Sequence, residues 1–143
     1  MGWDWLSLQL DDQSEVMLYR LRHEDGSADQ YSSGTFVDRD GKATHLKAGD
    51  FQLAPRGEVW RSRSSGATYL VAWTVTIPAL GLELSVRTSL TSQEITGKTK
   101  RSPSYWEGAV AISGRRSGSA MTWVGYLEMT GYDRPLLLNG DMR

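Results

Sequence analysis

The sequence has 143 residues, with 17 acidic against 16 basic side chains, a net charge of -1 and no Cys. Its length fits one domain, which we expect to span residues 1–143. The balanced charge argues against a nucleic-acid partner, and the lack of about 20 consecutive apolar residues argues against a membrane span. The absence of Cys excludes disulfides and thiolate metal sites. No secretory signal opens the chain, so we expect a soluble protein, cytoplasmic if the chain is full length.

The aromatic composition is uneven: six Trp and six Tyr accompany only two Phe. Indole and phenol rings combine an apolar body with a polar tip, so they suit half-polar pockets as well as cores. The composition therefore favours a domain with an aromatic-lined cavity.

Alternation with a period of two dominates the first segments. Leu6, Leu8 and Leu10 fall on one face of the first run and polar or indole side chains on the other, which predicts a strand. Residues 14–24 contain no Gly or Pro and fit either a short helix or a strand. We predict a strand, because the segment follows another strand after a hairpin-sized turn.

Turn signals separate the later segments. Residues 38–42 (DRDGK) resemble the start of a calcium loop but lack its downstream Glu, so we predict a hairpin. Residues 69–77 and 82–86 alternate again, on either side of a break at 78–81, and residues 91–104 are predicted to form the longest irregular loop. About nine or ten strands at such spacing, with little helix, predict an all-β antiparallel sandwich or barrel.

The sequence contains no recognisable motif for metal binding, nucleotide binding or nucleophilic catalysis. His23 and His45 stand without further ligands at suitable spacing, so we expect no metal site. No Gly-rich loop precedes a helix and no nucleophile elbow occurs, so we expect no cofactor.

Three carboxylates lie among aromatic residues and are candidates for acid-base catalysis: Asp4, Glu107 and Glu128. A carboxylate in a dry aromatic pocket holds its proton more tightly, which suits a general acid. The structural alternative is that each accepts a hydrogen bond from a nearby Trp or Tyr, or pairs with Arg20 or Arg22.

Several segments in order resemble the C-terminal domain of the AttH-like family, which includes carotenoid hydratases (hydroxyneurosporene synthases). They are Gly2–Asp12, Met17–Arg22, Ser33–Thr35 with Val37–Asp38, Tyr105–Val110 and Gly125–Tyr132. The resemblance implies a lipocalin-like (calycin-type) antiparallel β-barrel. Family members usually carry two such barrels side by side, and hydratase members add water to an acyclic carotenoid without a redox cofactor. The sequence does not include the family's upstream His-x-Trp segment or its first barrel, so it is either a free-standing half or one domain of a longer protein. For a free-standing half, the hypothesis is a homodimer in which a second copy replaces the first barrel.

Three hypotheses for function follow. The first is a stand-alone barrel that binds an apolar or polyene-like small molecule. Its expected binding residues are Trp3, Trp5, Gln9, Tyr19, Arg20, Trp73 and Tyr126. Of the remaining Trp residues, Trp60 and Trp123 are expected in the core, toward which Trp73 also leans. The second hypothesis is a cofactor-independent hydratase or cyclase that uses Asp4, Glu107 or Glu128 as acid. The third is a structural domain whose barrel is filled by side chains.

Overall fold

A computed structural model describes residues 1–99 and 102–135. Antiparallel strands make up nearly all of its regular structure, with one turn of 3-10 helix, η1 (Pro78–Leu80). The strands are β1 (Gly2–Gln9), β2 (Glu15–Arg22), β3 (Ser33–Val37), β4 (Ala43–Lys47), β5 (Gln52–Pro55), β6 (Val59–Arg61), β7 (Thr68–Leu70), β8 (Ala72–Ile77), β9 (Leu82–Arg87), β10 (Glu94–Ile95), β11 (Tyr105–Arg116) and β12 (Ser119–Met129).

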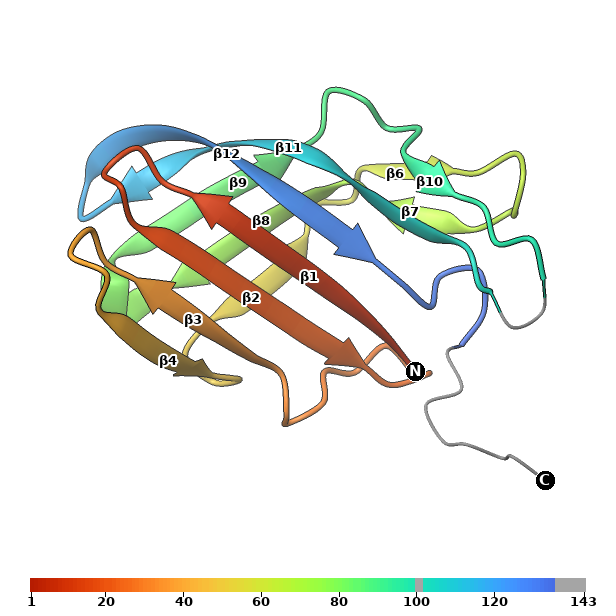
Figure 1. Cartoon of the computed structure of the whole chain (residues 1–143), viewed down its shortest axis with the longest axis horizontal. Coiled ribbons are helices and arrows are strands. Elements are labelled where there is room, and N and C mark those ends of the chain that lie inside the picture. The colour runs from red at the N-terminus through yellow and green to blue at the C-terminus, as the bar shows by residue number, and fades with distance from the viewer. Residues whose placement is uncertain (100–101, 136–143) are drawn as a thin grey trace.

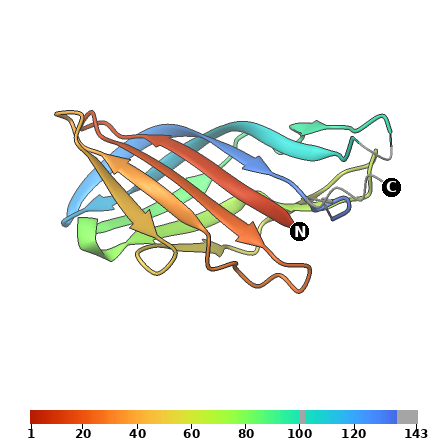
Figure 2. The ribbon, with the colours of Figure 1, turned by 60° about the horizontal axis from the view of Figure 1, so that its bottom comes forward.

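One ten-stranded sheet forms the body of the molecule. Its order is β4-β3-β2-β1-β12-β11-β9-β8-β5, with β10 paired to β11, and β6 and β7 form a separate ribbon. The sheet curls strongly, so that β1 to β4 lie in front of β8 and β9 in Figure 1, and the two flanks face each other in the turned view of Figure 2. The prediction of an all-β antiparallel fold with nine or ten strands is confirmed. β4 and β5 stand at the two ends of the sheet, which makes it an open, half-barrel form of the expected barrel.

The alternating sequence places one face of each strand inside the curl. In β1 the even positions, including Leu6 and Leu8, are buried and the odd positions are partly exposed. From the opposite flank, Trp73, Val75 and Ile77 of β8 are fully buried. Because side chains from both flanks meet on the concave side, this side is the hydrophobic core.

Local signals account for the connections between strands. Residues 14–24 contain strand β2, as predicted, which pairs with β1 along its whole length. Residues 38–42 form the predicted β3–β4 hairpin, in which Gly41 has φ +83° and the Asp38 carboxylate accepts hydrogen bonds from the backbone N–H groups of Asp40 and Lys42. A backbone position with positive φ favours Gly, because a residue with a Cβ is strained in that conformation.

Within residues 1–99 and 102–135, no helix is both long and apolar enough to cross a membrane.

The predicted loop at 91–104 is interrupted by β10, which pairs with the start of β11. The loop and the N-terminal end of β11 border the candidate site.

Candidate functional site

The strands divide the predicted site residues between the two faces of the sheet. Four of them lie on β1: the side chain of Asp4 is buried in the core, whereas those of Trp3, Trp5 and Gln9 point outward. Successive side chains of a strand alternate between faces, and residues directly opposite on neighbouring strands share a face. The inward set is Asp4, Arg20 and Trp73, and the outward set is Trp3, Trp5, Gln9, Tyr19, Glu107, Tyr126 and Glu128. The predicted residues therefore do not line one common cavity.

Asp4 lies at the centre of a buried ionic cluster. Its Oδ2 accepts two hydrogen bonds from Arg20, from Nε at 3.0 Å and from an Nη at 2.8 Å. The same Oδ2 lies 3.0 Å from Nε of Arg22, and Oδ1 accepts a hydrogen bond of 2.9 Å from the hydroxyl of Tyr132. A fully buried carboxylate requires such compensation, because burial of an unpaired charge is costly. This geometry matches the structural alternative for Asp4.

Aromatic rings pack against the cluster on the concave side. The Arg20 guanidinium lies 5.1 Å from the ring centroid of Trp73, and that of Arg22 lies 4.1 Å from the ring of Tyr132. The ring of Tyr132 in turn lies 5.4 Å from that of Tyr69. Arginine over an aromatic face is favourable, more so when both are desolvated.

Burial and the neighbouring carboxylate raise the pKa of Tyr132 well above its usual range, and the two arginines offset only part of that shift. Burial and a hydrogen bond to Glu94 likewise raise the pKa of Tyr69. Both phenols therefore remain hydrogen-bond donors at neutral pH. The roles of Tyr132 and Tyr69 in this cluster were missed from the sequence, because nothing in their spacing indicates that they lie close to Asp4 and Glu94.

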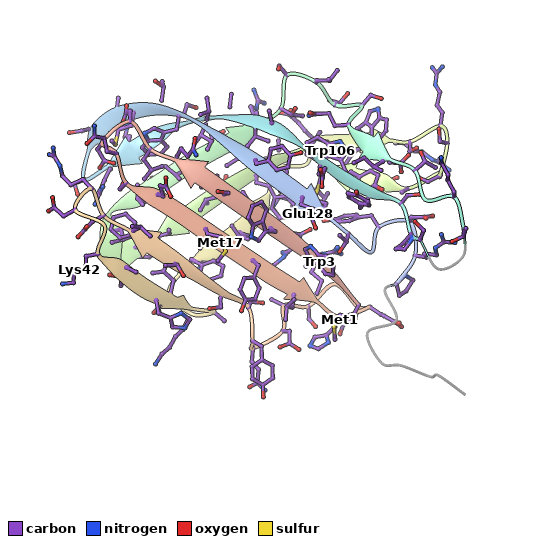
Figure 3. All side chains as sticks on the ribbon, viewed as in Figure 1. Met1, Trp3, Met17, Lys42, Trp106 and Glu128 are labelled. Carbon is purple, nitrogen blue, oxygen red and sulfur yellow. The ribbon has the colours of Figure 1, made fainter. Side chains whose placement is uncertain are left out.

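A pocket of about 460 Å³ opens on the outer face, beside the end of the 91–104 loop. It is lined by Trp3, Ser102, Pro103, Tyr105, Glu107, Glu128 and Thr130. Trp3 of β1 and Glu128 of β12 lie next to each other in Figure 3. Three of the predicted site residues, Trp3, Glu107 and Glu128, thus meet here. Ser102, Pro103 and Thr130 were missed, since their contribution depends on how the loop and the end of β12 fold back.

The two carboxylates of the pocket stand directly opposite each other, Glu107 on β11 and Glu128 on β12. The indole N–H of Trp3 donates a hydrogen bond of 2.6 Å to Glu128 Oε1, and the Tyr126 hydroxyl donates one of 3.1 Å to Glu107 Oε1. Partial burial, the hydrogen bond to Glu107 and the charges of both carboxylates raise the pKa of Tyr126. Like charges directly opposite each other destabilise a sheet, so the pair is unfavourable for stability when both carboxylates are ionised.

The other predicted residues lie outside this pocket. Trp5 and Tyr19 are neighbours on the outer face of β1 and β2, and Gln9 is exposed at the far end of β1. Trp123 is buried in the core, as expected, and Trp60 packs against it. Trp73, which was predicted as a binding residue although it also leaned to the core, is fully buried in the core. Among the described residues, no group of three or more His, Asp or Glu side chains is arranged to hold a metal ion.

Comparisons with known proteins place the chain in a family. The crystal structure of a protein from Nitrosomonas europaea assigned as AttH superposes with a TM-score of 0.75 and 30% identity, over 92% of this chain and 38% of that one. Kievitone hydratase from Nectria haematococca superposes with the same TM-score of 0.75 at 16% identity, over 93% of this chain and 40% of the enzyme. The chain thus spans about two fifths of the length of these relatives, and no curated protein matches it in sequence. The family model described as AttH-like matches residues 1–132, and the chain belongs to this family.

Proposed function

We propose that the domain binds a flat apolar small molecule that carries hydroxyl groups, in the pocket between Trp3 and Glu107. The supporting observation is the composition of this pocket. Indole, phenol and proline surfaces supply apolar contact, and two carboxylates on neighbouring strands supply hydrogen-bond acceptors. Binding sites for small molecules are mostly apolar with a few placed polar groups, and they measure about 300–1,000 Å³.

The carboxylates restrict the class of ligand. Each already accepts one hydrogen bond from an aromatic side chain, and each ionised carboxylate has further acceptor capacity. A ligand hydroxyl can use that capacity, whereas a ligand carboxylate would be repelled. Polyene and polyphenol alcohols therefore fit better than fatty acids.

The experiment compares two probes that differ in one group, retinol and retinyl acetate, by tryptophan fluorescence. We expect retinol to change the emission of Trp3 and to bind at least ten times more tightly than the acetate, in which the hydroxyl is blocked. Glu128→Gln should weaken retinol binding with little effect on the acetate. Trp3→Phe should remove most of the signal, whereas the control Trp60→Phe, altered on the β6–β7 ribbon, should keep it. Equal affinity for both probes, or a signal that persists in Trp3→Phe, would contradict this site.

The opposed carboxylates support a second candidate, a cofactor-independent hydratase. A carboxyl group at Glu107 or Glu128 would donate its proton to an alkene carbon, water would attack the resulting cation, and the opposite carboxylate would accept the proton lost by that water. Incubation with an acyclic carotene in heavy-oxygen water should then give a labelled tertiary alcohol that Glu107→Gln or Glu128→Gln abolishes. No labelled product would reject this candidate and leave the binding proposal standing.

A further inference from the structure

The pocket beside the 91–104 loop carries two negative charges when its carboxylates are ionised. Glu107 and Glu128 stand directly opposite each other on β11 and β12, and both are half-buried. Their hydrogen-bond donors, the indole of Trp3 and the phenol of Tyr126, are neutral groups. Within residues 1–99 and 102–135, no Lys, Arg or His side chain forms an ion pair with either carboxylate. This part of the chain therefore leaves the repulsion between the two carboxylates uncompensated.

The buried Asp4 provides a contrast within the same domain. Its Oδ2 lies 2.8 Å from a nitrogen of Arg20 and 3.0 Å from one of Arg22, so two positive charges surround one carboxylate. A neutral donor, by comparison, occupies a lone pair of a carboxylate without cancelling its charge. A cation bound between Glu107 and Glu128 would be attracted to both, and it would reduce the repulsion between them.

We propose that the pocket binds a flat apolar ligand more tightly when its polar end is a protonated amine than when it is a hydroxyl. The inference rests on the proposed function, because the pocket and the apolar part of the ligand are the same. An ammonium group donates up to three hydrogen bonds and can use the acceptor capacity that both carboxylates retain. It adds a positive charge that the hydroxyl lacks.

The aromatic walls of the pocket also favour a cation. Trp3 and Tyr105 line it, and Trp3 lies next to Glu128 in Figure 3. A cation close to the face of an aromatic ring is attracted by the negative charge of that face, most strongly for Trp. An ion pair at a partly exposed site contributes little by itself, so we expect the two carboxylates together to give a preference of about tenfold.

Retinol and retinylamine test this preference, because they differ only in the terminal group and the amine is protonated at neutral pH. Tryptophan fluorescence gives both dissociation constants, and their ratio within one variant cancels changes that affect both ligands alike. Wild type should bind retinylamine about ten times more tightly than retinol, and salt at about 0.5 M should reduce this ratio by screening the charges.

Variants assign the preference to the two carboxylates of the pocket. In the double variant Glu107→Gln, Glu128→Gln, the two dissociation constants should agree within about twofold, and each single variant should give an intermediate ratio. The matched control is Glu15→Gln, Glu83→Gln, which removes the same total charge from two exposed positions outside the pocket. The control should keep the wild-type ratio.

The possible outcomes distinguish this inference from the proposed function. If retinol binds and Trp3→Phe removes its signal, but retinylamine binds no more tightly, the amine preference is wrong and the pocket proposal stands. If neither probe binds, both proposals fail. If the ratio stays near ten in the Glu107→Gln, Glu128→Gln variant, or falls equally in the control, other groups attract the amine and the inference is overturned.

Discussion

The hydroxyl of Tyr132 donates a hydrogen bond of 2.9 Å to Oδ1 of Asp4, a residue 128 positions earlier in the chain. This bond connects the segment after the last strand to the interior side of the first strand. The stacking of Arg22 on the Tyr132 ring strengthens the same connection. One carboxylate thus organises two arginines and one phenol at one end of the curled sheet.

Replacement of Asp4 by Asn should strongly destabilise the fold. The amide keeps the shape of the side chain but leaves Arg20 and Arg22 without a counter-charge, and removal of one partner from a buried ion pair costs about 3–5 kcal/mol. The free energy of unfolding from urea titration measures this loss. Asp40→Asn, in an exposed turn, should change it by less than about 0.5 kcal/mol. Equal stability of the two variants would show that the ion pair contributes nothing net.

Alkaline pH should destabilise the fold through Tyr132. The pKa of Tyr132 in the native state is raised above the ordinary value of 10.0. Below about pH 9 the phenol is protonated in both the native and the unfolded state, so it does not change the stability there. Above pH 10 only the unfolded state releases this proton, and stability falls by about 1.4 kcal/mol per pH unit for each such tyrosine. Tyr132→Phe should make the fall of the unfolding free energy above pH 10 less steep by the contribution of one tyrosine. Urea titrations at a series of pH values from 7 to 11 measure this. A Tyr132→Phe variant whose stability falls as steeply with pH as that of the wild type would contradict this role of Tyr132.

Gly34 should tolerate no side chain. A Cβ there would lie 2.5 Å from a methyl group of Leu18 and 2.6 Å from the carbonyl oxygen of Met17, both on the neighbouring strand. Gly34→Ala must push β3 away from β2, and overpacking of this kind costs about 1–3 kcal/mol. Gly49 has open space around it and no positive φ, so Gly49→Ala should be neutral or slightly stabilising. Thermal unfolding distinguishes the two, and a stable Gly34→Ala would mean that the strands separate readily.

The strands were predictable because alternation is a local property. Leu6, Leu8 and Leu10 define a buried face from three positions, and the structure buries all three. The same alternation correctly placed Trp3 and Trp5 on the other side of β1. Turn residues such as Gly41 likewise act within a few positions, so the hairpins followed from the sequence.

The grouping of side chains into sites was not predictable, because it depends on strand order. The pairing of β1 with β12 places Trp3 beside Glu128, and no pattern in either segment encodes that neighbour. Trp73 and Tyr19 were predicted to share a cavity, whereas they lie on opposite faces of the curled sheet. The family resemblance, now confirmed, supplied the fold but not this division.

The pairing of β1 with β12 also has a kinetic consequence. During synthesis, β1 and β2 can form their hairpin early, but the other edge of β1 has no partner until residues 119–129 have left the ribosome. Pairing of segments so distant in sequence is slow, because a long loop must close before the contact forms. In that interval an unpaired strand edge and the surfaces of Trp3 and Trp5 are exposed together, a combination that promotes aggregation. Nascent chains that end before β12 are therefore the species most in need of a chaperone.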